Sequence, residues 1–206
     1  MNPWDKYVVP AIINLGCGCK MIEEERERVI PRAHGRVLEL GMGPGHNIAF
    51  YDTTRVSEVI GVDPSAELRP HAERRAAQST LPVSIQTTIA EKMDVEDKSI
   101  DTLVLTFTLC TIPDPISALT ACRRVLKPDA DIYFCEHGKA PDISIQKWQN
   151  RINPVWRRLL GGCNVNRPIP KLLEQSGYAI ADLESYYGEK GKGVAGYFYR
   201  GSAKPA

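Results

Sequence analysis

The sequence has no long hydrophobic run, no large excess of charge of either sign and no recognisable targeting segment. No stretch approaches the roughly 18 consecutive apolar residues that a membrane-spanning helix needs. The first residues, MNPWDKYVV, lack the basic region with which a signal peptide begins. The formal net charge is +1, so there is no general electrostatic attraction to nucleic acid. These absences predict a protein with no transmembrane segment and no nucleic-acid partner.

Cysteines are few, and they do not form the pattern of a disulfide framework or of a metal site. The chain has six cysteines, and only Cys17 and Cys19 lie close together. No second close pair completes a zinc-binding pattern, so no metal site is predicted. Several of the others lie in apolar runs, where a free thiol packs as a small hydrophobic side chain. Reduced cysteines of this kind indicate a cytoplasmic protein.

The order of the expected elements predicts an α/β fold in a single domain, 1–206. A chain of 206 residues is long enough for one well-cored domain. The expected strands are Val37–Leu40, Val56–Val62, Val83–Thr87, Thr102–Leu109, Asp131–Cys135, Ile180–Tyr187 and Val194–Arg200. Helices alternate with the first five strands, and the last two strands follow each other directly. This order predicts a Rossmann-like, mostly parallel seven-stranded sheet with helices on both faces and one antiparallel C-terminal strand.

Several helices are expected around this sheet. Residues 1–33 are expected to form an N-terminal helical cap, in which the run Glu23–Arg28 (EEERER) indicates a solvated helix face. A helix that begins at Pro113–Pro115 is expected to end at Lys127–Asp129. An amphipathic helical region is predicted over Asp142–Leu160, bent at Pro154.

A glycine-rich turn follows the first expected strand. Gly41, Gly43 and Gly45 alternate along it, and bare backbone of this kind lets a ligand approach closely. Asp63 ends the second strand, 22 residues after Gly41. A glycine turn after a strand, with an acid about 20 residues further on, is typical of a nucleoside-binding α/β unit. A dinucleotide fingerprint would need a glycine where His46 stands, which disfavours an NAD-binding domain.

With Glu39 two residues before the first glycine, the segment resembles the E/D-x-G-x-G-x-G signature of class I methyltransferases that use S-adenosylmethionine (SAM). The resemblance implies SAM as the cofactor and S-adenosyl-L-homocysteine as its product. It also implies that Asp63 accepts both ribose hydroxyls. The cofactor-binding residues predicted in this way are Glu39, Gly41, Met42, Gly43, Gly45, Asn47, Asp63, Pro64, Ala90, Glu91 and Thr106.

The stretch Ala90–Met93, followed by Asp97–Asp101, resembles the adenine-binding segment of the ubiquinone/menaquinone methyltransferase type. In that type, the residue before the Ala-Glu pair is usually an aspartate that faces the adenine amine. This chain has Ile89 at that position. Adenine is therefore expected to rest on apolar contacts and backbone.

The C-terminal third resembles the small-molecule thiol S-methyltransferase branch of the family. The matching segments are Tyr133–His137, Trp148–Gln149, Asn153–Trp156 and Gly162–Asn164. This resemblance implies methyl transfer to a small, apolar thiol. Animal members of the branch sit on membranes through an N-terminal hydrophobic anchor, which this sequence is expected to lack.

His137 is the candidate catalytic residue. It follows the buried fifth strand, at the sheet edge where open α/β sheets bind ligands, and an imidazole can accept a thiol proton near neutral pH. A hydrogen-bonded structural histidine is the equal alternative. The predicted acceptor pocket contains Cys110, Trp148, Trp156, Cys163 and Asn164. For the two cysteines, simple packing is the alternative, and for the two tryptophans it is a place in the core.

Other functions stay open at this stage. The acceptor can also be a quinone, a phenol, an amine or a lipid, or the chain can bind SAM without chemistry. Trp148 and Trp156 lie eight residues apart, hence near one helix face, with Arg151, Arg157 and Arg158 close by. That combination allows peripheral contact with a membrane. Monomer and dimer are both compatible with the sequence.

Overall fold

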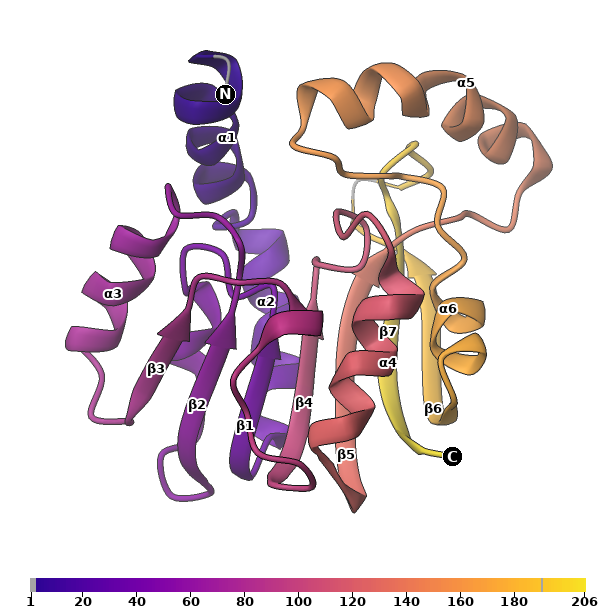
Figure 1. Cartoon of the computed structure of the whole chain (residues 1–206). Helices are drawn as coiled ribbons and strands as arrows, with labels where there is room; N and C mark the ends of the chain where they lie inside the picture. Colours follow the sequence, from indigo (N-terminus) through magenta and orange to yellow (C-terminus); the bar gives the residue numbers. More distant parts are fainter. Residues whose placement is uncertain (1–2, 190) are drawn as a thin grey trace.

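Seven strands form one sheet in the order β3-β2-β1-β4-β5-β7-β6 in the computed structural model, which describes residues 3–189 and 191–206 (Figure 1). The strands are β1 (Gly35–Leu40), β2 (Val56–Val62), β3 (Val83–Gln86), β4 (Ile100–Thr106), β5 (Leu126–His137), β6 (Tyr178–Tyr187) and β7 (Tyr197–Pro205). The first five strands are parallel, and β7 runs antiparallel to its neighbours β5 and β6. The predicted fold class is confirmed.

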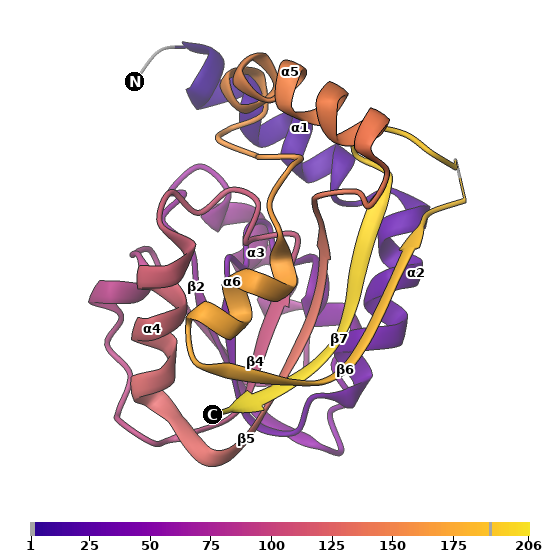
Figure 2. The same cartoon turned by 90° about the vertical axis from the view of Figure 1, so that its right-hand side faces the viewer.

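Helices cover both faces of the sheet because the central strands are apolar on both sides. In β1, Leu38 and Leu40 point to one core and Val37 to the other. The first core is closed by α4 (Pro115–Val125) and α6 (Ile169–Gln175), which lie on the same face of the sheet (Figure 2). The second core includes Val29 at the end of α2 (Lys20–Val29) and Ala72 of α3 (Arg69–Ala77).

Two further helices lie beyond the carboxyl ends of the parallel strands. The π-helical segment η1 (Trp4–Val8) leads into α1 (Val9–Gly16), and α5 (Ile143–Leu159) lies near them at the same end of the molecule (Figures 1 and 2). Nε1 of Trp4 donates a hydrogen bond to the carbonyl of Leu159, 3.2 Å away. The described residues also include four short 3-10 or π-helical segments: η1, η2 (Ile30–Arg32), η3 (His46–Phe50) and η4 (Ala90–Lys92).

The structure corrects two expectations about helices. The helix that begins at Pro115 ends at Val125, and Lys127–Asp129 lie within β5, because β5 pairs with β4 from Leu126 onward. The run Glu23–Arg28 is not uniformly solvated, since Glu25 is 7% exposed and Arg26 is 4% exposed. Both side chains find partners inside the protein, which the charge pattern alone does not reveal.

The last strand also differs from its predicted range. β7 begins three residues later than expected and continues to Pro205, because residues as far as Ala203 pair with β5. Gly201 stands where any side chain would strike the backbone of Asp182, so a glycine is required in the middle of this strand. Among the residues that the structure describes, no helix combines the length and the apolar character needed to cross a membrane.

Candidate cofactor and acceptor site

A cavity of about 560 Å³ opens at the carboxyl ends of β1, β2 and β4. Its volume lies in the range of pockets that hold small molecules and cofactors. The wall is formed by α1, the glycine turn, the residues after β2, residues 88–91, and residues 106–114 after β4. Ten of the predicted cofactor residues line it: Glu39, Gly41, Met42, Gly43, Asn47, Asp63, Pro64, Ala90, Glu91 and Thr106. Gly45 instead packs behind the wall, against Ala72 of α3.

The glycine turn presents bare backbone to this cavity. Gly41, Gly43 and Gly45 have φ angles of 72°, 55° and 79°, a region that L side chains rarely adopt. A side-chain carbon on Gly43 would meet no protein atom closer than 3.9 Å, so this residue faces open space. The turn is therefore shaped for a ligand that lies directly against its main chain.

Asp63 holds the glycine turn and lines the cavity at the end of β2. Its Oδ2 accepts a hydrogen bond from the backbone N–H of Gly43 at 2.8 Å, and its Oδ1 accepts one from Ser65 at 2.8 Å. Burial raises the pKa of Asp63 above its ordinary value. Each carboxylate oxygen keeps a lone pair for a further donor, which suits a pair of ribose hydroxyls.

Glu39 is buried at the end of β1 and is fully engaged. Its Oε1 accepts a hydrogen bond from Nδ2 of Asn47 at 3.0 Å, and its Oε2 accepts one from the hydroxyl of Tyr51 at 2.7 Å. Burial raises the pKa of Glu39 to about 7. Asn47 also donates to Oγ1 of Thr106, 2.8 Å away, which ties β1 to β4.

Arg26 of α2 is a cavity residue that the sequence did not reveal. Its Nε donates to Oδ1 of Asn47 at 2.8 Å, and its NH1 donates to the carbonyl of Cys17 at 2.5 Å. Burial lowers the pKa of Arg26, yet a guanidinium stays charged in proteins. A buried cation on the wall can bind the carboxylate of a ligand. Arg26 lies in the charged run Glu23–Arg28, which by itself predicts an exposed helix face, so its burial could not be predicted from the sequence.

The N-terminal cap is fastened directly to the glycine turn. Nε2 of His46 donates to the carbonyl of Asn14 at 3.0 Å. Arg75 of α3 bridges the two segments, since it donates to the carbonyl of Pro44 at 2.6 Å and to Oδ1 of Asn14 at 3.4 Å. Burial lowers the pKa of His46 to about 4, so its ring is neutral at pH 7. Val9, Pro10 and Ile13 of the same cap line the cavity and supply an apolar roof.

Glu136, next to the candidate His137, shapes the opposite wall. Its Oε1 accepts hydrogen bonds from the backbone N–H groups of Thr108 and Leu109, at 2.8 and 3.0 Å, while its Oε2 has no partner in the part of the chain that the structure describes. The side chain is fully buried, which raises its pKa to about 7. Glu136 thus holds the turn after β4, where Phe107 has a φ of 53°.

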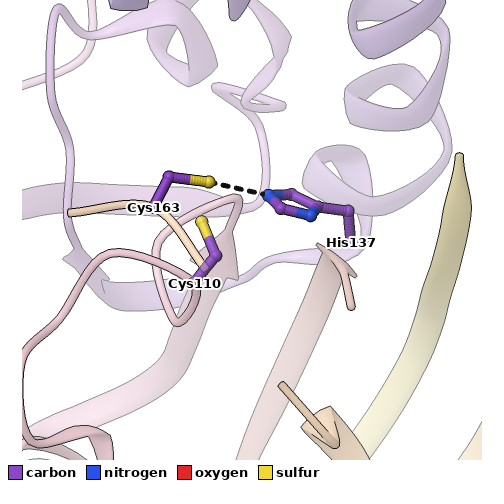
Figure 3. A group of neighbouring side chains, drawn as sticks. All are labelled: Cys110, His137 and Cys163. Carbon is purple, nitrogen blue, oxygen red and sulfur yellow. Dashed lines mark hydrogen bonds between the residues drawn. The ribbon is translucent and has the colours of Figure 1, made fainter. Parts of the chain in front are cut away.

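The side chains of His137, Cys110 and Cys163 come together at one point of the fold (Figure 3). Nε2 of His137 lies 3.3 Å from Sγ of Cys163. Asn164 fixes this arrangement, since its Nδ2 donates to the carbonyl of Cys110 at 2.9 Å. None of these four residues lines the cavity itself, although Thr111 and Gly161, which lie close to them in the chain, do so.

The two tryptophans of α5 lie apart from the cavity lining. Trp148 is 57% exposed, whereas Trp156 is half-buried and its Nε1 has no hydrogen-bond partner. Between them, the side chain of Gln149 is fully buried. It donates to the carbonyls of Gly138, Val165 and Val194 and accepts from the N–H of Ala140. Gln149 therefore anchors α5 to the segment that follows β5 and to the loops around Val165 and Val194. The roles assigned to the acceptor residues stay predictions.

A glycine turn after β1, an acid after β2 and a cavity between them define a nucleoside-binding α/β domain. A family model described as a methyltransferase domain matches residues 38–134. Thiol S-methyltransferase TMT1B of Homo sapiens is 30% identical over 176 residues, which are 80% of this chain and 71% of that protein. TMT1A of Homo sapiens, also named a thiol S-methyltransferase, is 32% identical over 153 residues, 72% of this chain and 62% of the relative.

Another relative is named for a different acceptor, and a solved structure has a similar fold. A ubiquinone biosynthesis O-methyltransferase of Hahella chejuensis is 33% identical over 107 residues, 52% of this chain and 44% of that protein. A crystal structure of a SAM-dependent methyltransferase from Methanosarcina mazei has a TM-score of 0.66 at 20% identity, covering 82% of this chain and 91% of that one. The chain belongs to the class I SAM-dependent methyltransferases, and its cofactor is SAM. The family predicted from the glycine signature is confirmed.

Proposed function

We propose that this protein transfers the methyl group of SAM to the sulfur of a small, apolar thiol. Two relatives that are named thiol S-methyltransferases, 30% and 32% identical to this chain, support a sulfur acceptor. Because the chain spans as little as 62% of such a relative, the acceptor of the whole protein stays a proposal.

One half of the cavity fits the donor. When bound, SAM supplies a methyl group on a positively charged sulfonium, which is already activated for displacement. Asp63 offers two carboxylate oxygens to the ribose, and the guanidinium of Arg26 offers donors to the methionyl carboxylate. Leu68, just before α3, and Ile89, just before η4, line the cavity and offer apolar surface to the adenine.

The other half is apolar, and this observation carries the proposal. The cavity is lined by Val9, Pro10 and Ile13 of the cap and by Phe107 and Ile112 after β4. Such walls exclude water and hold an apolar acceptor close to the donor, and proximity alone can lower a barrier by several kcal/mol. The thiolate is the nucleophile, so the remaining task is removal of the thiol proton.

The cluster behind this half is the candidate for that task. His137 is the candidate base that the sequence offers, with a structural histidine as the equal alternative, and its Nε2 lies 3.3 Å from Sγ of Cys163. Replacement by alanine should lower the rate and shift its pH profile. An unchanged rate and profile in His137→Ala would remove His137 from the reaction.

The test is a methyl-transfer screen with the purified chain and SAM. Hexanethiol, 2-mercaptoethanol, a quinol and vesicles that contain phosphatidylethanolamine are the acceptors, and mass spectrometry follows both the added methyl and S-adenosylhomocysteine. We expect methylation of hexanethiol, and less of the polar thiol. Methyl appearing only on the quinol or the lipid amine would replace the thiol by that acceptor, and Asp63→Asn is the control for donor binding.

An acceptor of this kind can be delivered from a lipid surface. Eight large hydrophobic side chains are exposed on the neighbouring cap and α5: Trp4, Tyr7, Ile12, Leu15, Ile143, Trp148, Val155 and Leu159. Arg151, Arg157 and Arg158 lie on the same α5 helix. We propose that this end of the molecule makes peripheral contact with membranes, since an interfacial helix combines apolar and basic side chains. A cytoplasmic location and a monomeric or dimeric state stay predictions.

A further inference from the structure

Cys110, His137 and Cys163 reach the same point from three separate parts of the fold. Cys110 lies in the turn after β4, His137 ends β5, and Cys163 lies in the loop after α5 (Figure 3). The two sulfurs and a ring nitrogen all lie within 4.8 Å of one another. The spacing of these residues in the sequence does not predict the group, because its members are more than 25 residues apart in the chain.

The separations suit a single metal ion. A tetrahedral zinc ion with Zn–S of about 2.3 Å and Zn–N of about 2.0–2.1 Å holds its ligands roughly 3.5–3.8 Å apart. The distance from Nε2 of His137 to Sγ of Cys163 is already 3.3 Å. The other separations are at most 4.8 Å, so an ion has to draw these atoms together by no more than about 1 Å.

The surrounding backbone holds this arrangement in place. The carbonyl of Cys110 accepts hydrogen bonds from both the N–H and the Nδ2 of Asn164, at 2.8 and 2.9 Å. Oδ1 of Asn164 accepts in turn from Asn153 of α5 at 3.1 Å. Nδ1 of His137 is buried and has no hydrogen-bond partner among the described residues, so a neutral ring can carry its proton there and direct the Nε2 lone pair at Cys163. The hydrogen bonds of Asn164 therefore hold the backbone around the cluster in place without a bound ion.

We propose that Cys110, His137 and Cys163 bind one zinc ion, or a chemically similar borderline-soft divalent cation. Two sulfurs and an imidazole nitrogen are the ligands that this class of ion prefers. Within the described part of the chain, no fourth histidine, cysteine or acid joins the group. Three protein ligands leave one position open, which is typical of zinc sites that bind a substrate rather than of closed structural sites. Binding converts both thiols to thiolates and releases their two protons to solvent.

The open position has a use if the acceptor is a thiol, and this step rests on the proposed function. Thr111 and Gly161 line the cavity beside Cys110 and Cys163, so the cluster adjoins the acceptor half. A thiol sulfur is a ligand that zinc accepts and that it deprotonates on binding. In that arrangement His137 is a metal ligand, and the ion replaces the imidazole as the group that generates the thiolate.

The experiment measures metal binding by the full chain without SAM or acceptor. Purified protein is titrated with Zn²⁺ against a chromogenic chelator, and with Co²⁺ while thiolate-to-metal absorption is recorded. We expect one ion per chain, and at least about a 100-fold loss of affinity in Cys163→Ser and in His137→Asn. Cys19→Ser changes an exposed cysteine and should bind normally. SAM binding by calorimetry confirms that each variant is folded.

The outcomes separate this proposal from the proposed function. Absence of saturable Zn²⁺ binding, or binding that Cys163→Ser leaves unchanged, would overturn the metal site and would leave thiol methylation untouched. Conversely, a chain that binds one Zn²⁺ through these residues but methylates only a quinol keeps the metal site and loses the thiol acceptor.

Discussion

Gly41 and Thr108 adjoin so closely that any side-chain carbon on Gly41 would overlap the Thr108 hydroxyl. Gly41 belongs to the turn after β1, and Thr108 to the turn after β4, so the contact joins the two segments that frame the cavity. It explains why the first glycine of the turn is required even apart from any ligand.

Gly41→Ala should therefore lower the free energy of unfolding by about 2–4 kcal/mol, the combined cost of overpacking and of a left-handed backbone at an alanine. Gly43→Ala is the matched comparison, because a carbon there meets only open space. It should cost about 1 kcal/mol of stability and should mainly weaken SAM binding. Urea unfolding and calorimetry measure the two effects, and equal destabilisation by both substitutions would contradict the packing argument.

Asp63→Asn should weaken SAM and S-adenosylhomocysteine binding by about 10- to 100-fold, because hydrogen bonds to a charged group are each worth about 1.5–3 kcal/mol. The amide also has to present an N–H group to Gly43 or Ser65, which are themselves donors. Asp129→Asn changes an exposed carboxylate far from the cavity and should leave affinity unchanged. Calorimetric titration checks both. Unaltered affinity in Asp63→Asn would mean that the ribose is held elsewhere.

Glu136 should make the folded state more stable in acid than at neutral pH. Its pKa is about 7 in the folded protein against an ordinary value of 4.5, so the folded state holds an extra proton between these values. The resulting stabilisation is present below about pH 4.5 and is lost as pH rises through 7, and it is on the order of 3 kcal/mol.

Glu136→Gln keeps the oxygen that accepts from Thr108 and Leu109 and cannot titrate. The free energy of unfolding of the native protein should therefore fall relative to this variant between pH 4.5 and 7. Urea unfolding across that range provides the measurement. Parallel pH curves for the two proteins would show that Glu136 is not protonated in the folded state near neutrality.

Gln149→Ala should destabilise the protein by about 2–4 kcal/mol, because it leaves three carbonyls and one N–H without their buried partner. Gln146→Ala, three residues earlier on α5, removes one hydrogen bond to the carbonyl of Pro141 and should cost much less. Thermal unfolding ranks the two variants. A similar melting temperature for both would argue against a specific role of Gln149 in seating α5.

Trp148→Ser combined with Val155→Ser should reduce binding to phospholipid vesicles, because both side chains are exposed on α5. Leu183→Ser, on β6, removes an apolar side chain of similar exposure outside the cap and α5, and should bind as the native chain does. Co-sedimentation with phosphatidylcholine vesicles, with and without phosphatidylserine, measures the difference. Equal loss of binding in the double variant and in Leu183→Ser would point to non-specific adhesion.

The donor half of the site could be predicted because its signals are local. The glycine turn and Asp63 each sit at the end of an apolar strand, and parallel strands bring their carboxyl ends to one edge. Arg26 could not be found in this way, since its burial depends on Asn47 and Cys17 rather than on neighbours in the chain. The cluster around His137 escaped detection as a unit for the same reason: three distant segments assemble it.

The topology of β7 has a consequence for the order in which the protein is made. β6 joins the sheet only through β7, and His137 pairs with Phe198 of that last strand. During synthesis, the segments that form the SAM turn emerge from the ribosome long before Phe198 does. The donor half can thus take shape on the nascent chain, whereas the strand beside His137 is completed only when β7 inserts between β5 and β6. An interrupted translation product would then resemble a cofactor-binding fragment in which His137 lacks its neighbouring strand.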